Sequence, residues 1–217
     1  MSKVLVIAAH PDDELLGCGG TLIKHVQKGD EVKCLLMCEG ESLRYVGQNV
    51  QQSTATEKAA KVIGFSEVIR CNFPDQKLDT YTLVDVIKPI EQVVDTFEPD
   101  IVYVQNGEDI NRDHQIVYEA ASVALRPTAP SVKEIYTFYT VGSTEWNYPA
   151  AFRPNVWVDI EAQLDKKIEA FRCYNSEVRE YPHPRSEQAL RNLAAYTGNQ
   201  CCMKAAEAFM LIRKIEH

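Results

Sequence analysis

The sequence predicts an α/β fold in which a mostly parallel, doubly wound sheet carries helices on both faces. Two observations lead to this prediction. Short apolar runs alternate with stretches of helical spacing along the 217 residues, and several of those stretches end at a glycine or just before a proline. Strands that alternate with helices form parallel crossover units, and such units build a doubly wound sheet.

The first part of the chain carries the regular part of this pattern. The run KVLVIAA at 3–9 is typical of a buried strand, and helical spacing follows over 13–28 until Gly29. Pro89 is expected to kink the helix at 83–97 or to delay its start, because proline lacks the N–H of an interior helical position. Further strands are expected at 31–38, 67–73 and 100–105, and further helices at 50–63 and 113–125.

The last third of the chain is less regular. Strand patterns occur at 134–140 and 156–160, and a helical pattern covers 161–176. A Pro-His-Pro loop follows, and one or two helical stretches are expected after it. Because the sequence shows no internal repeat, low-complexity segment or linker, residues 1–217 are expected to form one domain.

Composition narrows the class of protein. The net charge is -8 and the pI about 5.2, so an acidic surface would repel nucleic acid. No apolar run approaches the roughly 18 residues of a membrane span, and no signal peptide pattern opens the chain. Seven cysteines, an odd number without a CxxC pair, favour free thiols in a reducing cytoplasm.

Polar sequences follow two of the expected strands at the point where each strand ends. HPDDE (10–14) comes directly after the first strand, and NGEDINRDHQ (106–115) follows the strand at 100–105. With the strand order 3-2-1-4, these two strands are neighbours where the order reverses, and ligands of open α/β sheets bind there. The two sequences are therefore expected to meet in one crevice.

The residue types in this crevice favour a metal site. His10, Asp13 and His114 are a ligand set for a catalytic zinc that leaves one position open for water. Asp12 is better placed as the general base, because the side chains of adjacent residues diverge. Asp113 is expected to orient an imidazole ring.

Simpler interpretations of these residues stay open at this point. Proline at the first helical position and acidic residues in the first turn are favoured at any helix start, so HPDDE can arise for that reason alone. GCGG (17–20) begins eight residues after Ala9, too late for the dinucleotide fingerprint. These glycines are expected to let the helix pack closely on the sheet.

Three stretches together resemble the PIG-L/LmbE-like family of zinc-dependent N-acetylglucosamine deacetylases. They are AAHPDDELLGCGGTL (8–22), DINRDH (109–114) and the tail PHPRSEQALRNLAAYTGNQCCMKAAEAF (182–209). The resemblance spans nearly the whole chain and implies a Rossmann-like fold. It also implies hydrolysis of an N-acetyl amide on an amino sugar, with Zn²⁺ held by His10, Asp13 and His114 and with Asp12 as the base. Fe²⁺ in the cell stays open, because such ligand sets also take ferrous iron.

One position departs from the family pattern. Many members have a His-Pro-Asp-His stretch whose first histidine is thought to stabilise the oxyanion or assist the leaving group, and this chain has Asn111 there. An asparagine amide can donate a hydrogen bond to an oxyanion but cannot deliver a proton. The leaving amine would then be protonated by Asp12, acting a second time, or by another group such as His183.

Substrate contacts are expected from two loops. Arg44, in the loop at 39–47, opens on the same edge of the sheet and could grip hydroxyls or a phosphate. His183 and Arg185 lie in the proline-bounded loop at 182–186. A homo-oligomer in which this loop reaches a neighbouring subunit is one arrangement that stays open.

Two other functions are compatible with parts of the pattern. A sugar- or nucleotide-binding module with a vestigial metal site would explain the fold, but the intact set of acidic and histidine residues argues against it. A non-haem iron oxygenase also uses two histidines and one carboxylate, although those enzymes usually have all-β folds.

Overall fold

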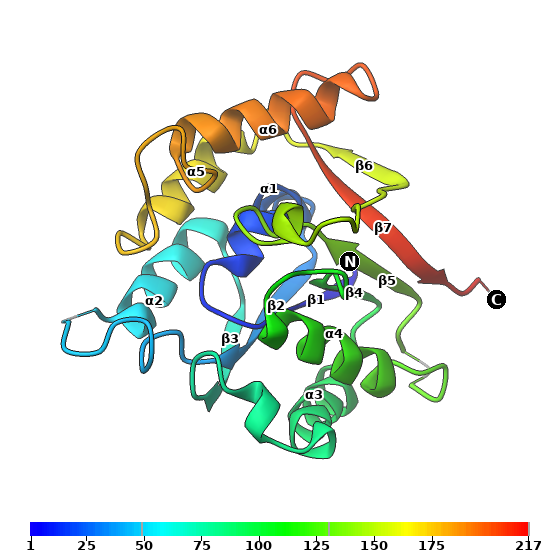
Figure 1. Ribbon diagram of the computed structural model, residues 1–217. Coiled ribbons are helices and arrows are strands. Elements are labelled where there is room, and N and C mark those ends of the chain that lie inside the picture. Colours follow the sequence, from blue (N-terminus) through cyan, green and yellow to red (C-terminus); the bar gives the residue numbers. More distant parts are fainter. Residues whose placement is uncertain (49, 130, 217) are drawn as a thin grey trace.

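Helices cover both faces of a central sheet (Figure 1). The computed structural model describes residues 1–48, 50–129 and 131–216. The strands of this described part are β1 (Lys3–Ala8), β2 (Glu31–Cys38), β3 (Glu67–Phe73), β4 (Ile101–Gln105), β5 (Glu134–Phe138), β6 (Val156–Asp159) and β7 (Ala206–Lys214). The helices are α1 (Asp13–Gln27), α2 (Gln52–Ile63), α3 (Leu83–Phe97), α4 (Arg112–Ala124), α5 (Leu164–Arg172) and α6 (Glu187–Asn199). None of the helices described is long and apolar enough to cross a membrane.

The strand order is β3-β2-β1-β4-β5-β7-β6. The five strands from β3 to β5 are parallel, whereas β7 runs antiparallel to both of its neighbours. The predicted order 3-2-1-4 is therefore confirmed, and so is the mostly parallel, doubly wound α/β fold. Because β1 pairs with β4, the loops after these two strands leave the sheet side by side.

Alternate residues of β1 feed two separate cores. Val4, Val6 and Ala8 pack with α1, α2, α5 and α6, whereas Leu5 and Ile7 pack with α3 and α4. Side chains alternate between the two faces of a strand, so a strand covered on both faces is apolar throughout. The continuous apolar run that predicted the first strand has this cause.

The helix at 83–97 forms as predicted, but Pro89 does not delay its start. A capping box sets the beginning at Leu83: the Thr82 hydroxyl accepts the Asp85 N–H, and the Asp85 carboxylate accepts the Thr82 N–H. Pro89 lies inside the helix. The cap therefore overrides the preference of proline for the first turn.

The C-terminal region differs from the prediction. One helix, α6, follows the Pro-His-Pro loop, which agrees with the one or two helical stretches predicted there. Residues 206–214 then form strand β7, which was not predicted. This segment is rich in Ala, Glu, Met and Leu, which favour helices. Tertiary pairing decides the outcome, because β7 fills the gap between β5 and β6. The helix expected at 161–176 is also shorter and covers Leu164–Arg172.

The glycines of GCGG serve close packing, as predicted. A Cβ on Gly17 would overlap the ring of Phe138, and one on Gly20 would lie 2.9 Å from Ile160. The helix is also interrupted here, since Cys18 has the non-helical angles φ -141 and ψ 17. The Glu207 carboxylate on β7 accepts the freed N–H groups of Gly20, at 2.8 Å, and of its neighbour in the helix.

Candidate metal centre and active site

Two loops at the carboxyl edge of the sheet build the centre. His10 and Asp12 lie in the loop between β1 and α1, and Asp13 is the first residue of α1. Asn111 ends the loop between β4 and α4, and His114 lies in the first turn of α4. The pairing of β1 with β4 brings these loops together, although about 100 positions separate them in the chain.

Three donor atoms form an equilateral triangle. His10 Nδ1, Asp13 Oδ2 and His114 Nε2 lie 3.3 Å from one another, and their side chains are buried. A tetrahedral zinc ion with bonds of about 2.0–2.1 Å holds neighbouring ligand atoms about 3.3 Å apart. The three atoms thus match three corners of such a site, and the donor set suits zinc. Asp13 Oδ1, also buried, makes no hydrogen bond to any described residue.

Carboxylates fix the orientation of both imidazole rings. His10 Nε2 lies 3.0 Å from Asp113 Oδ2, and His114 Nδ1 lies 3.2 Å from Asp109 Oδ1. Each contact leaves the opposite ring nitrogen facing the triangle. Carboxylate partners of this kind fix the tautomer of a metal-binding histidine and make it a better ligand. Asp113 therefore contacts His10, which lies across the crevice, and not His114, its neighbour in the sequence.

Two supporting residues were missed by the sequence reasoning. Asp109 accepts hydrogen bonds from the Ser143 and Thr144 hydroxyls, which hold its carboxylate beneath the histidine. Gln105, at the end of β4, donates to Asp13 Oδ2 at 2.8 Å and accepts the Ala9 N–H. Asp109 stood inside the DINRDH stretch, where it could have been noticed, whereas nothing in the spacing marked Gln105.

The Asp12 carboxylate contacts a cation. Its carboxylate Oδ2 lies 3.0 Å from Arg185 Nη1, and the same nitrogen lies 2.7 Å from Glu177 Oε2. The backbone of Asp12 adopts φ 104, and its N–H donates to the Glu14 carboxylate at 3.1 Å. Asp12 and Asp13 are therefore adjacent in the chain but sit in separate surroundings.

The two neighbouring carboxyl groups have opposite pKa shifts. Burial raises the pKa of Asp12 well above its usual value, with the Arg185 guanidinium acting against it. Burial also acts to raise the pKa of Asp13, but His114 and His10 hold it well below its usual value. Paired groups whose environments push their pKa values apart are typical of acid–base sites. Asp13 is suited to remain an anion, and Asp12 is suited to take up a proton.

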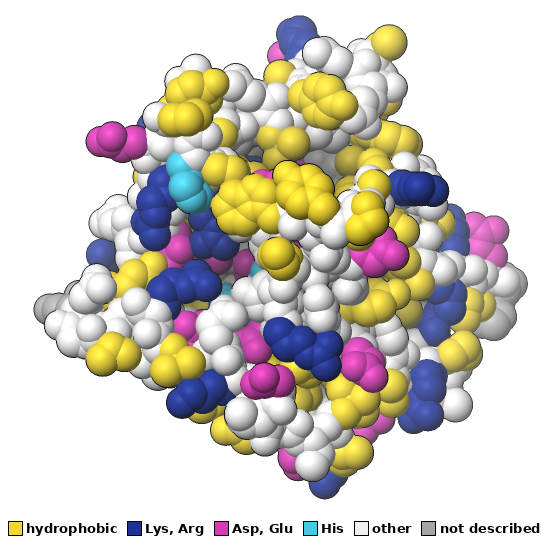
Figure 2. Space-filling view, in the orientation of Figure 1, with side chains coloured by type: hydrophobic (Ala, Val, Ile, Leu, Met, Phe, Trp, Pro, Cys, Tyr) yellow, Lys and Arg dark blue, Asp and Glu magenta, His cyan; other side chains and the backbone are white. Residues whose placement is uncertain are grey.

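The predicted residues mostly line one pocket. Figure 2 shows a hollow on this face where acidic and histidine side chains lie between basic ones. The structure places seven of the nine predicted site residues in the pocket lining: His10, Asp12, Asp13, Arg44, Asn111, His114 and Arg185. Asp113 lies behind His10, and His183 lies outside the lining.

Asn111 and His183 have defined hydrogen-bond roles. Asn111 caps α4, and its Oδ1 accepts the Asp113 N–H at 2.9 Å, which leaves the amide nitrogen as its free donor group. His183 is half-buried, and its Nδ1 accepts the Arg185 N–H at 3.0 Å. Burial lowers the pKa of His183, and the charges of Arg179 and Arg185 lower it further.

Arg185 contacts the candidate site of the chain that carries it. Its contacts to Asp12 and Glu177 make it a partner of the acidic groups, whereas the sequence predicted a substrate contact. The loop that carries it contributes to the lining of this pocket within one chain.

Known proteins share the sequence pattern and the fold of this chain. The family profile described as PIG-L, GlcNAc-PI de-N-acetylase, matches residues 5–125. The uncharacterized deacetylase YaiS of Escherichia coli K12 is 33% identical over 181 residues, which cover 80% of this chain and 90% of that protein. The diacetylchitobiose deacetylase of Thermococcus kodakarensis is 26% identical and covers 98% of this chain and 84% of its own length. The conserved protein TT1542 from Thermus thermophilus shares the fold, with a TM-score of 0.81 at 24% identity over 100% of this chain and 97% of its own. On the family match and the identity with the Escherichia coli relative, this chain belongs to the PIG-L family.

Proposed function

We propose that this protein is a zinc-dependent N-deacetylase that removes the acetyl group from an N-acetylglucosamine-type sugar or its conjugate and releases acetate. The observation that carries the proposal is the 3.3 Å triangle of His10 Nδ1, Asp13 Oδ2 and His114 Nε2 at the bottom of a polar pocket. Family membership supports the reaction class, as do the names of the relatives, which are deacetylases.

The triangle would hold the metal. When bound, a zinc ion polarises an amide carbonyl and lowers the pKa of a coordinated water to about 7. The same donors accept Fe²⁺, so both ions belong in the test. Asp113 and Asp109 keep the two imidazole rings in the orientation that binding requires.

Asp12 is the proposed general base. It is buried beside the ligand Asp13, and its environment favours uptake of a proton. Arg185 keeps the carboxylate in place through the 3.0 Å contact. A base of this kind contributes about 10²–10⁴-fold to the rate.

The structure favours Asp12 over His183 as the group that protonates the leaving amine. His183 lies outside the pocket lining, and its lowered pKa leaves less of the protonated imidazolium available as a proton donor at neutral pH. Asn111 contributes differently. With Oδ1 held by the Asp113 N–H, its amide nitrogen is free to donate a hydrogen bond to the oxyanion.

The wider expectations remain part of the proposal. We assign residues 1–217 to one domain that acts on a small amino-sugar substrate, without nucleic acid. The seven cysteines are free thiols, which supports a reducing cytoplasm as the compartment. A homo-oligomer is compatible with the proposal, and residues of one chain line the pocket.

An acetate-release screen tests the proposal. The substrates are free, phosphorylated, nucleotide-linked and inositol-linked N-acetylglucosamine and diacetylchitobiose, with zinc-loaded and ferrous enzyme compared under nitrogen. We expect acetate from at least one substrate. Oxygen uptake with ferrous iron and a 2-oxo acid would instead indicate an oxygenase, and amino-sugar binding without any hydrolysis would indicate a binding module.

Three variants assign the roles. Asp12→Asn should retain zinc in elemental analysis but lose about 10²–10⁴-fold in kcat. His114→Ala should lose the zinc itself, because it removes one of three ligands. Asp95→Asn, an exposed carboxylate on α3, is the matched control and should behave as wild type. An Asp12→Asn variant with the wild-type rate would overturn the assignment of the base.

A further inference from the structure

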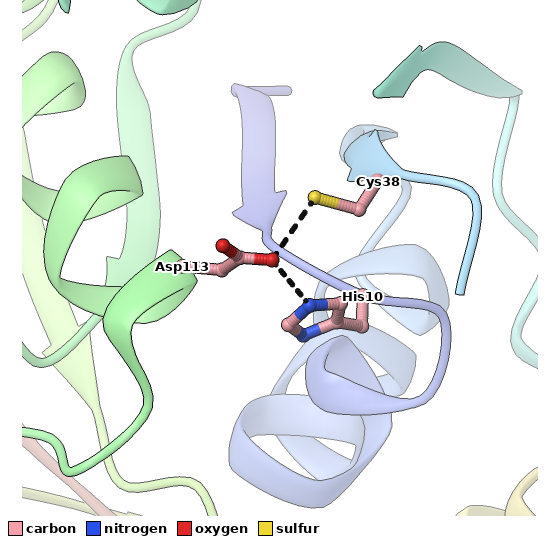
Figure 3. A group of neighbouring side chains, drawn as sticks. All are labelled: His10, Cys38 and Asp113. Carbon is pink, nitrogen blue, oxygen red and sulfur yellow. Dashed lines mark hydrogen bonds and ion pairs between the residues drawn. The ribbon is translucent and has the colours of Figure 1, made fainter. Parts of the chain in front are cut away.

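The far nitrogen of His10 lies in a second group of side chains whose donor atoms are of the types that bind metals. His10 Nε2, which faces away from the triangle, lies 3.0 Å from Asp113 Oδ2 and 3.4 Å from Asp75 Oδ1. The Cys38 thiol donates to the same Asp113 oxygen at 3.5 Å (Figure 3). Ligand atoms of His10, Cys38 and Asp113 all lie within 4.8 Å of one another, and the three side chains are buried.

We propose that His10 Nε2, Cys38 Sγ and Asp113 Oδ2 form a second metal site that is selective for thiophilic cations such as Cd²⁺ and that competes with the triangle for His10. The site goes beyond the proposed function. Binding there does not depend on deacetylation, and only the loss of activity that follows from it rests on the role assigned to the triangle.

The chemistry of the donors sets the selectivity. Thiolate ligands select soft cations, whereas Mg²⁺ and Ca²⁺ prefer oxygen donors alone. A cation bound there must displace the thiol proton of Cys38, and only a cation with a strong preference for sulfur does so.

The charges of the donors also favour a divalent cation. The Asp113 carboxylate and the Cys38 thiolate would together supply two negative charges, which balance a divalent ion. Asp75 is buried as well, and its Oδ1 lies 3.4 Å from His10 Nε2, but it stands beside this ligand group and not within it.

Proton balance makes the two sites compete. A neutral imidazole has one nitrogen lone pair and one N–H. With zinc at Nδ1, the proton lies on Nε2 and donates to Asp113. A cation that takes Nε2 releases the thiol proton of Cys38 to solvent and sends the ring proton to Nδ1. Nδ1 then lacks the lone pair that the triangle needs, so His10 cannot serve both ions in its neutral form.

Cadmium titration of the zinc-loaded enzyme tests the inference. Two readouts are followed: the ultraviolet charge-transfer band of a cadmium thiolate, and the zinc released into the filtrate by elemental analysis. Wild type should gain the band and lose zinc together. Cys38→Ser and Cys38→Ala should lack the part of the charge-transfer band that comes from the Cys38 thiolate. Both variants should also need at least about tenfold more cadmium to release the zinc.

Cys71→Ser is the matched control, because Cys71 is a partly buried thiol on the neighbouring strand β3. It should respond as wild type, and the surface thiols should give the same background in every variant. Zinc release at the same cadmium concentration with and without Cys38 would overturn the proposal. A Cys38-dependent band with the zinc fully retained would overturn the competition for His10. Both readouts are independent of whether the enzyme deacetylates anything.

Discussion

Replacing Arg185 by methionine separates two roles that the sequence alone could not distinguish. Methionine keeps part of the apolar stem and removes the guanidinium. In the structure that guanidinium lies 3.0 Å from Asp12 and 2.7 Å from Glu177, so one cation serves two buried carboxylates. If this contact is its main role, Arg185 is a positioning residue for the base. If Arg185 grips the substrate instead, it acts on binding.

The structure gives the size of the expected effect. Breaking a buried ion pair by removing one partner costs about 3–5 kcal/mol, because the remaining charge loses its compensation. That range is an upper limit here, since Asp12 can take up a proton in place of the lost cation. A protonated Asp12 cannot accept a proton from water, so kcat should fall by about 10²–10⁴-fold. Zinc content should be retained, because Arg185 contacts none of the three ligands.

The assay combines urea unfolding with kcat and KM. Arg185→Lys should lose less stability and less kcat than Arg185→Met, because lysine keeps the positive charge although it lacks the planar geometry of the guanidinium. The double variant Arg185→Met, Glu177→Gln should lose less unfolding free energy than the two single variants together. The coupling energy should be about 0.5–3 kcal/mol. A rise in KM at unchanged kcat and unchanged stability would refute this reasoning and assign Arg185 to the substrate.

Three further predictions concern stability, each measured by urea unfolding against wild type. Gly17→Ala should cost about 1–3 kcal/mol, because the overlap of its Cβ with the buried Phe138 ring outweighs the gain of about 1 kcal/mol in helix propensity; a stabilised variant would contradict this. Glu207→Gln should lower the unfolding free energy by about 3–5 kcal/mol, because it leaves the Lys167 ammonium buried without its anionic partner at 2.7 Å. Adding Lys167→Met should recover part of that loss. Unfolding free energies that add strictly would argue against the pair. Asp100→Asn should cost less than about 1 kcal/mol at pH 7. Burial acts to raise the pKa of Asp100, but hydrogen bonds from a lysine side chain and a backbone N–H hold it below its usual value. The difference in unfolding free energy between Asp100→Asn and wild type should therefore vanish as the pH falls through that pKa, and a difference that grows would contradict this.

The alternation of strands and helices was sufficient to predict the sheet order around the site. Strand β7 shows the limit of that approach. Its residues favour a helix locally, and it becomes a strand because β5 and β6, which lie far away in the sequence, leave a place between them. A local pattern does not contain that information. The prediction was therefore better for the parallel half of the sheet than for the antiparallel edge.

The candidate site shows the same division. His10, Asp13 and His114 could be placed together because each follows the end of a strand whose neighbour was known. Which carboxylate contacts which ring depends on side-chain direction, so no sequence pattern indicated that Asp113 pairs with His10. The loop at 182–186 is a second example, because Arg185 enters the pocket and His183, two residues earlier, does not.

The simplest interpretation of HPDDE, an ordinary helix start, does not account for Asp12. Asp12 occupies the N-cap of α1, yet its side chain makes no capping hydrogen bond. Its φ of 104 is unfavourable for a residue with a side chain, at a cost of about 1–3 kcal/mol. Its carboxylate is buried and turned toward Arg185, and the Glu14 carboxylate holds its N–H. A residue selected to begin a helix would cap it from a relaxed backbone in contact with water. The fold instead gives up stability to hold this carboxylate beside Asp13, and the proposed role of Asp12 as general base would account for that loss.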